Sequence, residues 1–243
     1  MESMTMELQI KNISKSFNRN FLFDGFTVDF KEGIITCILG PSGCGKTTLL
    51  NILGKIVSPD SGVLIGFEGK SASYIFQEPR LLPWKTVRGN IEFVLSRKFS
   101  QAERKEQVDR LIRLVELDGF ADHYPSQLSG GMRQRVSIAR AFASPSDVIL
   151  MDEPLSGLDI ALKRNIIQWF SQIWEADKRT VIFVTHDVDE ALSLGEEIIV
   201  LSQAPVQIVA HESINEPAGK RDVQAPRFAE IRKTLFNALG KTD

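Results

Sequence analysis

The chain has 243 residues, which is enough for one substantial hydrophobic core with an insertion or for two small lobes. Its 29 basic and 31 acidic side chains nearly balance, so there is no overall positive field to attract nucleic acid, and we expect no nucleic-acid partner. No apolar run approaches the ~20 residues that span a bilayer, and Met1 to Lys11 lack the apolar core of a signal peptide, which predicts a soluble chain. The two cysteines, Cys37 and Cys44, indicate neither a disulfide nor a zinc site and fit a reducing cytoplasm.

Residues 7–77 are predicted to form short strands with glycine-rich turns around a phosphate-binding loop. The pattern Gly-Pro-Ser-Gly-Cys-Gly-Lys-Thr at 40–47 follows an apolar strand over 34–39 and precedes a short helix that ends at Gly54. In this strand-loop-helix setting the pattern predicts ATP or GTP binding. We expect Lys46 to contact the β- and γ-phosphates and the Thr47 hydroxyl to bind Mg²⁺. The residues expected to line the nucleotide here are Gly40, Pro41, Ser42, Gly43, Cys44, Gly45, Lys46, Thr47 and Thr48.

Residues 78–142 change to a helical pattern. A helix is predicted within 101–117, where apolar residues recur at Val108, Leu111, Ile112, Leu114 and Val115. The sequence Leu-Ser-Gly-Gly at 128–131 then opens a second helix. Ser129 is placed to cap this helix, and Gly130 and Gly131 leave backbone amides bare, so we expect an anion at its N-terminus. The arginines of this helix favour a solvated or ion-paired face over a DNA-binding surface; they are Arg133, Arg135 and Arg140.

Residues 143–205 return to apolar strands and helices in alternation, which is typical of a parallel sheet. A buried strand over 148–151 is followed by Asp152 and Glu153, at the strand end where ligands bind in open α/β sheets. We expect Asp152 to hold magnesium and Glu153 to orient and deprotonate the attacking water; the alternative is a solvated acidic turn. Residues 206–243 form a C-terminal extension, and the apolar stripe from Phe228 to Leu239 predicts a short helix packed on the core.

The Leu-Ser-Gly-Gly turn, the phosphate loop and the Asp-Glu strand end together resemble the ATP-binding cassette (ABC) family, and the resemblance covers residues 8–239. It implies a single domain over 1–243 with an α/β fold of the P-loop NTPase, ABC-ATPase type. A parallel-sheet core over 7–77 and 143–205 would carry an antiparallel β arm, and a helical signature subdomain would be inserted at 78–142. The β arm is expected to be short, because few residues separate Lys46 from Gln77.

The resemblance also implies roles for four further residues. Gln77 is similar to the family's Q-loop glutamine, a catalytic residue and a ligand of Mg²⁺, and His186, in Thr-His-Asp after an apolar strand, is similar to the switch histidine that contacts the γ-phosphate. Asp159 ends a Ser-Gly-Leu-Asp stretch that resembles the D-loop. Phe17 occupies the position of an aromatic that stacks on adenine, where tyrosine is commoner; a core phenylalanine is the alternative.

In the family each ATP lies between the phosphate loop of one cassette and the signature turn of another. Because this chain has one copy of each, the resemblance implies a dimer, which we expect to be a homodimer. The residues expected to contact the partner's ATP are Ser129, Gly130, Gly131 and Asp159. ATP would hold the dimer together as substrate, with Mg²⁺ as cofactor, and hydrolysis would release it.

The segment 76–91 resembles a subfamily of bacterial importers for nitrate, sulfonates, taurine and thiamine-precursor pyrimidines, and the tail 226–232 resembles the ending of the same group. This implies a membrane permease bound through the region from Gln77 to Trp84, a periplasmic or lipoprotein solute-binding protein, and a place at the cytoplasmic face of the cell membrane. The alternative for Trp84 is packing inside the helical insertion. Two other functions compete: a non-transport ABC ATPase in DNA repair, translation or cofactor assembly, and a subunit that does not hydrolyse ATP, which would be expected to lack Glu153 or His186.

Overall fold

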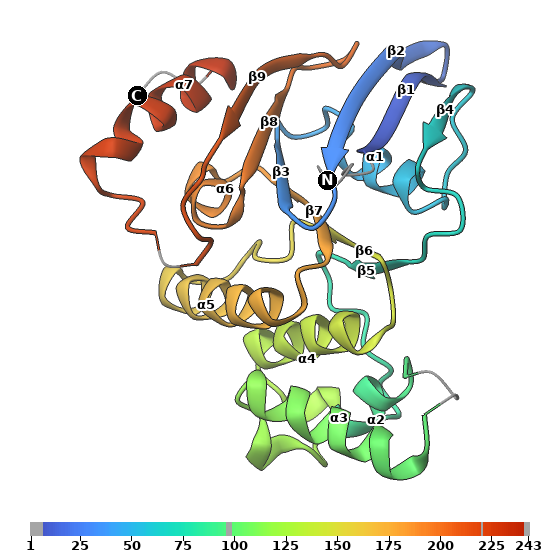
Figure 1. Ribbon diagram of the computed structural model, residues 1–243, viewed down its shortest axis with the longest axis vertical. Helices are drawn as coiled ribbons and strands as arrows, with labels where there is room; N and C mark the ends of the chain where they lie inside the picture. Colours follow the sequence, from blue (N-terminus) through green and yellow to red (C-terminus); the bar gives the residue numbers. More distant parts are fainter. Residues whose placement is uncertain (1–6, 96–98, 220, 241–243) are drawn as a thin grey trace, which may run out of the picture.

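The computed structural model describes residues 7–95, 99–219 and 221–240, and it contains two β-sheets (Figure 1). The sequence predicts that the N-terminal stretch, residues 1–11, is not a signal peptide. Residues 1–6 of this stretch lie outside the described residues. The first sheet is antiparallel and three-stranded, in the order β2 (Asn20–Lys31), β1 (Glu7–Phe17), β4 (Ser61–Ile65). The strands β1 and β2 are 11 and 12 residues long, longer than the short strands predicted, and bulges bend their pairing.

The second sheet has six strands, in the order β5 (Ala72–Ile75), β6 (Val148–Asp152), β7 (Thr180–Thr185), β3 (Ile35–Leu39), β8 (Glu197–Leu201) and β9 (Ile208–Ser213). All neighbours pair in parallel except β8 and β9. Strands β3, β7 and β8 are buried along their whole length, as expected of parallel strands covered on both faces. The predicted α/β fold with a parallel core and an antiparallel arm is therefore confirmed.

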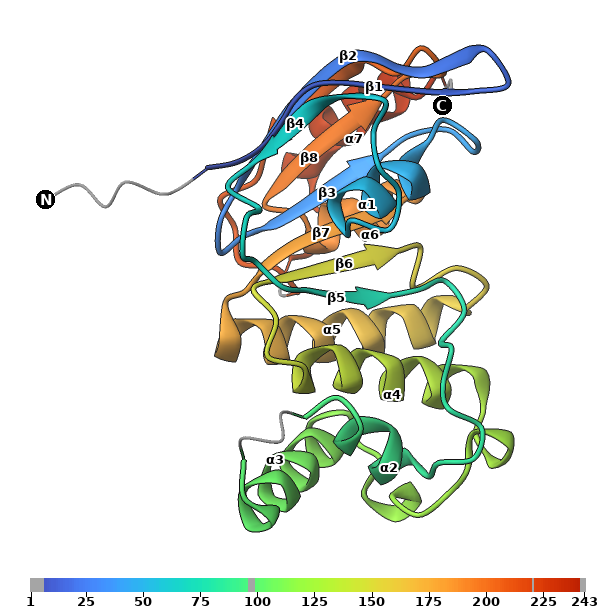
Figure 2. The ribbon, with the colours of Figure 1, turned by 90° about the vertical axis from the view of Figure 1, so that its right-hand side faces the viewer.

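Successive side chains of β3 enter different hydrophobic clusters, because neighbouring residues of a strand point to opposite faces. Ile35, Cys37 and Leu39 pack with α4 (Gly130–Ala143), α5 (Ile160–Asp177) and α6 (Val188–Leu194). Ile38 packs on the other face, with α1 (Lys46–Leu53) and the three-stranded sheet. Figure 2 shows these layers stacked, from the three-stranded sheet at the top to the helices below the main sheet. Cys37 and Cys44 are both buried and free.

The lower part of the molecule in Figure 2 contains α2 (Val87–Glu92), α3 (Gln101–Leu114), two short 3₁₀ turns (Asp118–Phe120 and Pro125–Gln127) and α4. Side chains cap each helix at its start. Thr86 and Ser129 accept hydrogen bonds from backbone amides of α2 and α4, and Ser100 forms a capping box with Glu103 at α3. The predicted cap at Ser129 is thus confirmed, and α3 ends slightly before the predicted position.

The C-terminal extension runs back along the core and ends in a 3₁₀ turn (Pro226–Phe228) followed by α7 (Ala229–Ala238). Phe228 and Leu235 are buried in the same cluster as α4, α5 and α6, so the helix packs on the core as its stripe predicted. Within the described residues, no helix has the length and apolar character needed to cross a membrane.

Candidate functional site

The phosphate loop lies between the carboxyl end of β3 and the start of α1, and backbone geometry explains its glycines. Gly43 and Gly45 have φ of 78° and 101°, and a Cβ on Gly45 would lie 2.9 Å from the Leu22 side chain. The Lys46 ammonium, on a buried side chain, donates to the carbonyls of Gly40 at 2.8 Å and Pro41 at 3.0 Å. The carbonyls at the start of the loop therefore hold the Lys46 ammonium.

Cys44 differs from the other predicted nucleotide contacts because its side chain points into the core. It is fully buried, and a Cβ built on Gly40 would lie 2.7 Å from its Sγ. Burial raises the pKa of the Cys44 thiol, although the nearby Lys46 opposes this shift. Only the backbone of Cys44 can face a phosphate in this arrangement.

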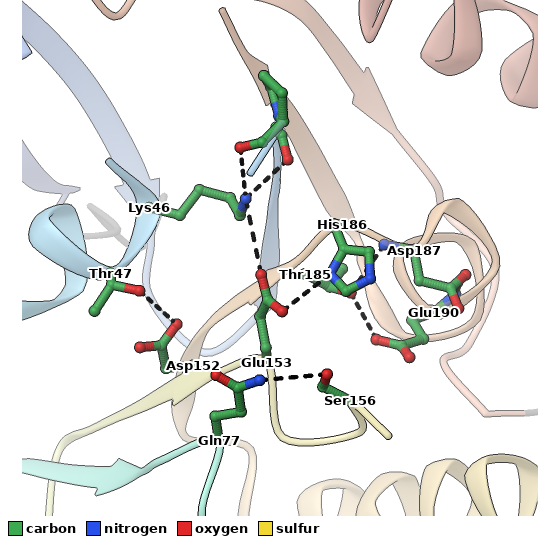
Figure 3. Close-up of polar contacts among 12 residues, drawn as sticks. Lys46, Thr47, Gln77, Asp152, Glu153, Ser156, Thr185, His186, Asp187 and Glu190 are labelled. Atoms are coloured by element: carbon green, nitrogen blue, oxygen red, sulfur yellow. Dashed lines mark hydrogen bonds and ion pairs between the residues drawn. The ribbon is translucent and has the colours of Figure 1, made fainter. Parts of the chain in front are cut away.

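Two acids meet the phosphate loop at the end of β6 (Figure 3). Asp152 accepts a hydrogen bond from the Thr47 hydroxyl at 3.1 Å, and burial raises the pKa of its carboxyl group, although the Thr47 bond lowers it in part. Glu153 Oε1 lies 3.8 Å from Lys46 Nζ, and Glu153 Oε2 lies 3.0 Å from His186 Nδ1. These contacts join five of the residues predicted at the site: Lys46, Glu153 and His186 in one group, and Thr47 and Asp152 in another.

Glu153 is held in an unusual backbone conformation. Its φ is 42°, a left-handed value that is uncommon for residues other than glycine, and its amide donates to the Val184 carbonyl of β7 at 3.0 Å. The turn therefore fixes the carboxylate beside His186, which follows β7. A solvated acidic turn would not need this bond to a neighbouring strand.

Gln77 follows β5, the strand that pairs with β6, and is exposed. Its Nε2 donates to the Ser156 hydroxyl at 3.4 Å, which connects two of the predicted loops (Figure 3). Asp159 caps α5, with its carboxylate accepting from the Leu162 amide at 2.9 Å, and it is exposed. Both residues thus lie on turns that follow strands of the main sheet.

The signature turn lies at the start of α4 with Ser129 and Gly130 exposed, whereas Gly131 is buried. A Cβ on Gly131 would lie 2.4 Å from the Leu162 side chain of α5, so glycine at this position allows a tight helix-helix contact. The role expected of the Gly131 backbone amide stays a prediction. Among the described residues, no hydrogen bond or salt bridge joins Ser129 to the phosphate loop of the same chain.

The three arginines of α4 each contact a partner within the chain. Arg135 stacks 3.2 Å over the ring of Trp169 and pairs with Glu116 at 3.7 Å, and Arg133 donates to the Leu128 carbonyl at 2.7 Å. Arg140 donates at 3.0 Å to the carbonyls of both Pro79 and Arg80, which ties α4 to the segment after Gln77. The expected solvated or ion-paired face is therefore found as an ion pair at Arg135, whereas Arg133 and Arg140 bind backbone carbonyls instead.

Phe17 and Trp84 are both exposed, so the alternative of core packing is wrong for each. Phe17 is 50% exposed at the end of β1, with Lys15 Nζ 5.5 Å from its ring centre, and Trp84 is 70% exposed. Their expected roles, in adenine stacking and permease binding, stay predictions.

Asn90, which the sequence analysis did not single out, organises the loop that carries Trp84. Its fully buried amide donates to the carbonyls of Leu82, Lys85 and Thr86 at 3.0–3.2 Å. Its oxygen accepts from the Leu82 amide at 2.8 Å. The sequence signal for this role is an asparagine, Asn90, shortly after the Pro83-Trp84 pair, because a buried asparagine needs hydrogen-bond partners and a nearby loop can supply them.

These residues define a phosphate-loop nucleotide-binding site at the carboxyl ends of β3, β6 and β7 in a parallel sheet. Comparison with known proteins extends this definition. Residues 23–156 match the family model described as "ABC transporter". An uncharacterized ABC transporter ATP-binding protein of Methanocaldococcus jannaschii is 40% identical over 98% of this chain and 93% of its own length.

Two of the relatives with named functions are import ATP-binding proteins. An aliphatic sulfonates import ATP-binding protein of Bacillus cereus is 38% identical over 95% of both chains. A sulfate/thiosulfate import ATP-binding protein of Acinetobacter baylyi is 40% identical over 98% of this chain and 68% of its own length. Among solved structures, the dimeric structure of a bacterial ABC transporter cassette superposes with a TM-score of 0.74 at 31% identity, covering 87% of this chain and all of that one. The same cassette has also been solved in a post-hydrolysis state with ADP and Pi, which superposes with a TM-score of 0.72. The chain therefore belongs to the ABC transporter family and is an ATP-binding cassette ATPase.

Proposed function

We propose that this chain is the ATP-hydrolysing subunit of an ABC importer, bound to a separate membrane permease at the cytoplasmic face of a cell membrane. The observation that carries the proposal is the exposed Trp84 on a loop held by the buried Asn90, close behind Gln77. A large aromatic side chain on a rigid loop is a typical anchor of a protein-protein interface. Because Arg140 ties the same segment to the signature helix, movement at this loop would reach the helix that faces the partner's ATP.

The residues at the sheet edge support hydrolysis by positioning and proton transfer. Glu153, next to His186, would orient a water and accept its proton, while Lys46 would exchange the Gly40 and Pro41 carbonyls for the phosphates. His186 would contact the γ-phosphate. Gln77 would orient the water from the opposite side.

The expected Mg²⁺ fits the donors that are present. Thr47 and Asp152 already lie within hydrogen-bond distance, and together with the Gln77 amide oxygen they offer the hard oxygen ligands that magnesium prefers. When bound, the ion neutralises charge on the β- and γ-phosphates. The hydrogen bond from Thr47 keeps the Asp152 carboxylate in place for that role.

The signature residues support a homodimer. Ser129, Gly130 and Asp159 are exposed and unconnected to the phosphate loop of the described chain, so they are free to complete the site of a second copy. Gly131 would act through its backbone and its close packing on Leu162. Phe17, exposed beside the phosphate loop's sheet, would stack on the adenine.

The solute would be a small organic or inorganic anion or a related compound, such as a sulfonate, taurine, nitrate or a thiamine-precursor pyrimidine, delivered by a periplasmic or lipoprotein solute-binding protein. Support comes from the similarity to a sulfonate importer subunit over nearly the full length of both chains. The sulfate/thiosulfate relative widens the same class.

The test combines transport with assembly. A strain lacking the gene is supplied with wild type or Glu153→Gln, and uptake of labelled taurine, an alkanesulfonate, nitrate, sulfate and a pyrimidine precursor is measured. We expect one uptake to be lost and restored only by wild type. Tagged wild type, Trp84→Ala and Phe21→Ala are then recovered from detergent-solubilised membranes, Phe21 being a similarly exposed aromatic on the β1–β2 hairpin. A multi-spanning protein should be recovered with wild type and Phe21→Ala but not with Trp84→Ala. Unchanged uptake of every solute, with no such protein, would favour a non-transport ATPase.

A further inference from the structure

His186 is followed by Asp187, which caps α6, and the first turn of this short helix carries two further acids, Asp189 and Glu190. The turn is internally bonded. Asp187 Oδ1 accepts from the amides of Asp189 at 2.9 Å and Glu190 at 3.3 Å. The Thr185 hydroxyl donates to Glu190 Oε2 at 2.6 Å and accepts from the Asp187 amide at 3.1 Å (Figure 3). His186 therefore lies between two residues, Thr185 and Asp187, that belong to one hydrogen-bonded unit.

A lysine from α5 ties this acidic turn to the D-loop. Lys163 Nζ donates to Asp187 Oδ2 at 3.0 Å and lies 2.6 Å from Glu190 Oε1, with the Glu190 side chain only 5% exposed. The Lys163 amide in turn donates to the Asp159 carbonyl at 2.9 Å. Burial lowers the pKa of Lys163, but the hydrogen bonds to Glu190 and Asp187 outweigh burial and raise it, so the side chain stays an ammonium. Lys163 and Asp159 are thus one helical turn apart, and Lys163 reaches the segment that holds His186.

An arginine from the C-terminal extension ties the same turn from another element. Arg232 of α7 forms a salt bridge with Asp189 through Nη1 and donates to the Val223 carbonyl through Nη2 at 2.7 Å. Earlier in the extension, Arg221 donates to the carbonyls of Leu192 at 2.8 Å and Gly195 at 2.6 Å, which are at the other end of α6. The extension therefore holds both ends of the helix that begins after His186.

We propose that Lys163 and Arg232 are positioning residues for His186, which they hold toward Glu153 by fixing the first turn of α6 to the D-loop helix and to the C-terminal helix. The inference rests on the proposed contact of His186 with the γ-phosphate. The proposal implies that the C-terminal extension contributes to ATP hydrolysis, because Arg232 lies in this extension and its partner Asp189 lies three residues after His186. It also connects the partner-facing Asp159 with the histidine of the same chain.

We expect the rate of ATP hydrolysis to depend on the exact position of the His186 side chain. His186 is half-exposed, and within the described residues its side chain has one hydrogen-bond contact, the 3.0 Å approach of Nδ1 to Glu153. Its orientation consequently depends on the backbone of 185–187, which the network fixes. A small displacement of a group that contacts the reacting phosphate is enough to slow the chemical step, without removing any contact that binds ATP.

The experiment compares Lys163→Met and Arg232→Gln with His186→Ala, by single-turnover ATP hydrolysis and by equilibrium binding of a fluorescent ATP analogue. Arg164→Gln and Arg227→Gln are the matched controls: Arg164 is the exposed neighbour of Lys163, and Arg227 is an exposed tail arginine that pairs with Glu216 and not with α6. We expect about a 10-fold loss of the hydrolysis rate for Lys163→Met and Arg232→Gln, nucleotide affinity within about 2-fold of wild type, and no loss for either control. Lys163→Arg should recover much of the rate.

Double variants separate positioning from general damage. Because the two residues act through His186, neither Lys163→Met nor Arg232→Gln should slow hydrolysis further in a His186→Ala background. Wild-type rates in both single variants, or an additional loss on top of His186→Ala, would overturn the inference while leaving the role of His186 intact. A His186→Ala variant with a normal rate would instead overturn the proposed role of His186. Lys163→Met leaves the buried Glu190 without its cation, which can prevent folding. In that case Arg232→Gln provides the test, since its partner Asp189 is half-exposed and stays hydrated.

Discussion

Replacing Glu153 with glutamine separates the chemistry of this site from its binding of ATP. Glutamine has the same shape as glutamate, so it keeps a hydrogen-bonding group 3.0 Å from His186 Nδ1. It also leaves in place the hydrogen bond from the backbone amide of residue 153 to the Val184 carbonyl. It removes the carboxylate that is placed to accept a proton from water. It also removes the negative charge 3.8 Å from the Lys46 ammonium.

Loss of the proton acceptor lowers the rate of hydrolysis, whereas loss of the negative charge near Lys46 favours ATP binding. A general base contributes about 10²–10⁴-fold to a rate, which corresponds to roughly 3–5 kcal/mol of activation free energy. The carboxylate, in contrast, competes with the γ-phosphate for Lys46 and repels it, and it does so effectively because the Lys46 side chain is only 5% exposed. We therefore expect hydrolysis to slow by at least about 100-fold while the affinity for ATP stays the same or increases.

The measurement is phosphate release under single-turnover conditions, together with ATP binding by calorimetry and the mass of the nucleotide-bound species in solution. The slow variant should accumulate as an ATP-bound dimer. A hydrolysis rate within about 10-fold of wild type would remove Glu153 from the role of general base. A large loss of ATP affinity would show instead that the carboxylate supports the phosphate loop, and the competition argument for Lys46 would be wrong.

Three other predictions follow from specific contacts. A mixture of Ser129→Arg and Lys46→Ala chains should regain part of the ATPase activity that each lacks, because a mixed dimer has one site free of both changes; inactive mixed dimers, verified by tagged pull-down, would contradict the shared site. Arg179→Met should lower the free energy of unfolding by about 3 kcal/mol in urea denaturation, because Arg179 donates at 2.7 Å to the Phe142 and Ser144 carbonyls where α4 ends. The exposed-pair control Glu175→Gln should change it by less than about 0.5 kcal/mol, and equal effects would refute the capping role. Gly131→Ala should reduce ATPase activity through its 2.4 Å clash with Leu162, and Leu162→Ala should restore part of it; no recovery would locate the defect at the partner's ATP.

Local patterns predicted the parts of this protein that local physics determines. The phosphate loop needs glycines with positive φ directly after a buried strand, and Ser129 caps the helix that it precedes, so both could be recognised within a few residues. The acids at the end of β6 were predictable because a fully apolar strand leads to them. Asp152 and Glu153 were expected near Thr47 and Lys46 because β3 and β6 belong to one parallel sheet, whose carboxyl ends lie at the same edge.

Contacts between distant segments were not predictable in the same way. Arg140 was expected on a solvated or ion-paired face, but its partners are carbonyls about 60 residues away along the chain, and an arginine on a polar helix face does not reveal which carbonyl it will reach. The packing of Leu162 from α5 against Gly131 could not be predicted for the same reason. The length of β1 and β2 was missed because bulges interrupt the alternation that marks a strand.

The first turn of α5 explains why these distant contacts matter for the mechanism. Asp159 caps the helix and is exposed, Leu162 packs against Gly131 of the signature helix, and Lys163 holds the acidic turn after His186. A helical turn is stiff, because its backbone hydrogen bonds join residues four apart, here Lys163 to Asp159. A displacement of Asp159 therefore carries Leu162 and Lys163 with it. The signature turn and His186 of one chain consequently share a support, and two of the residues that build it, Leu162 and Lys163, lie between the motifs rather than within them.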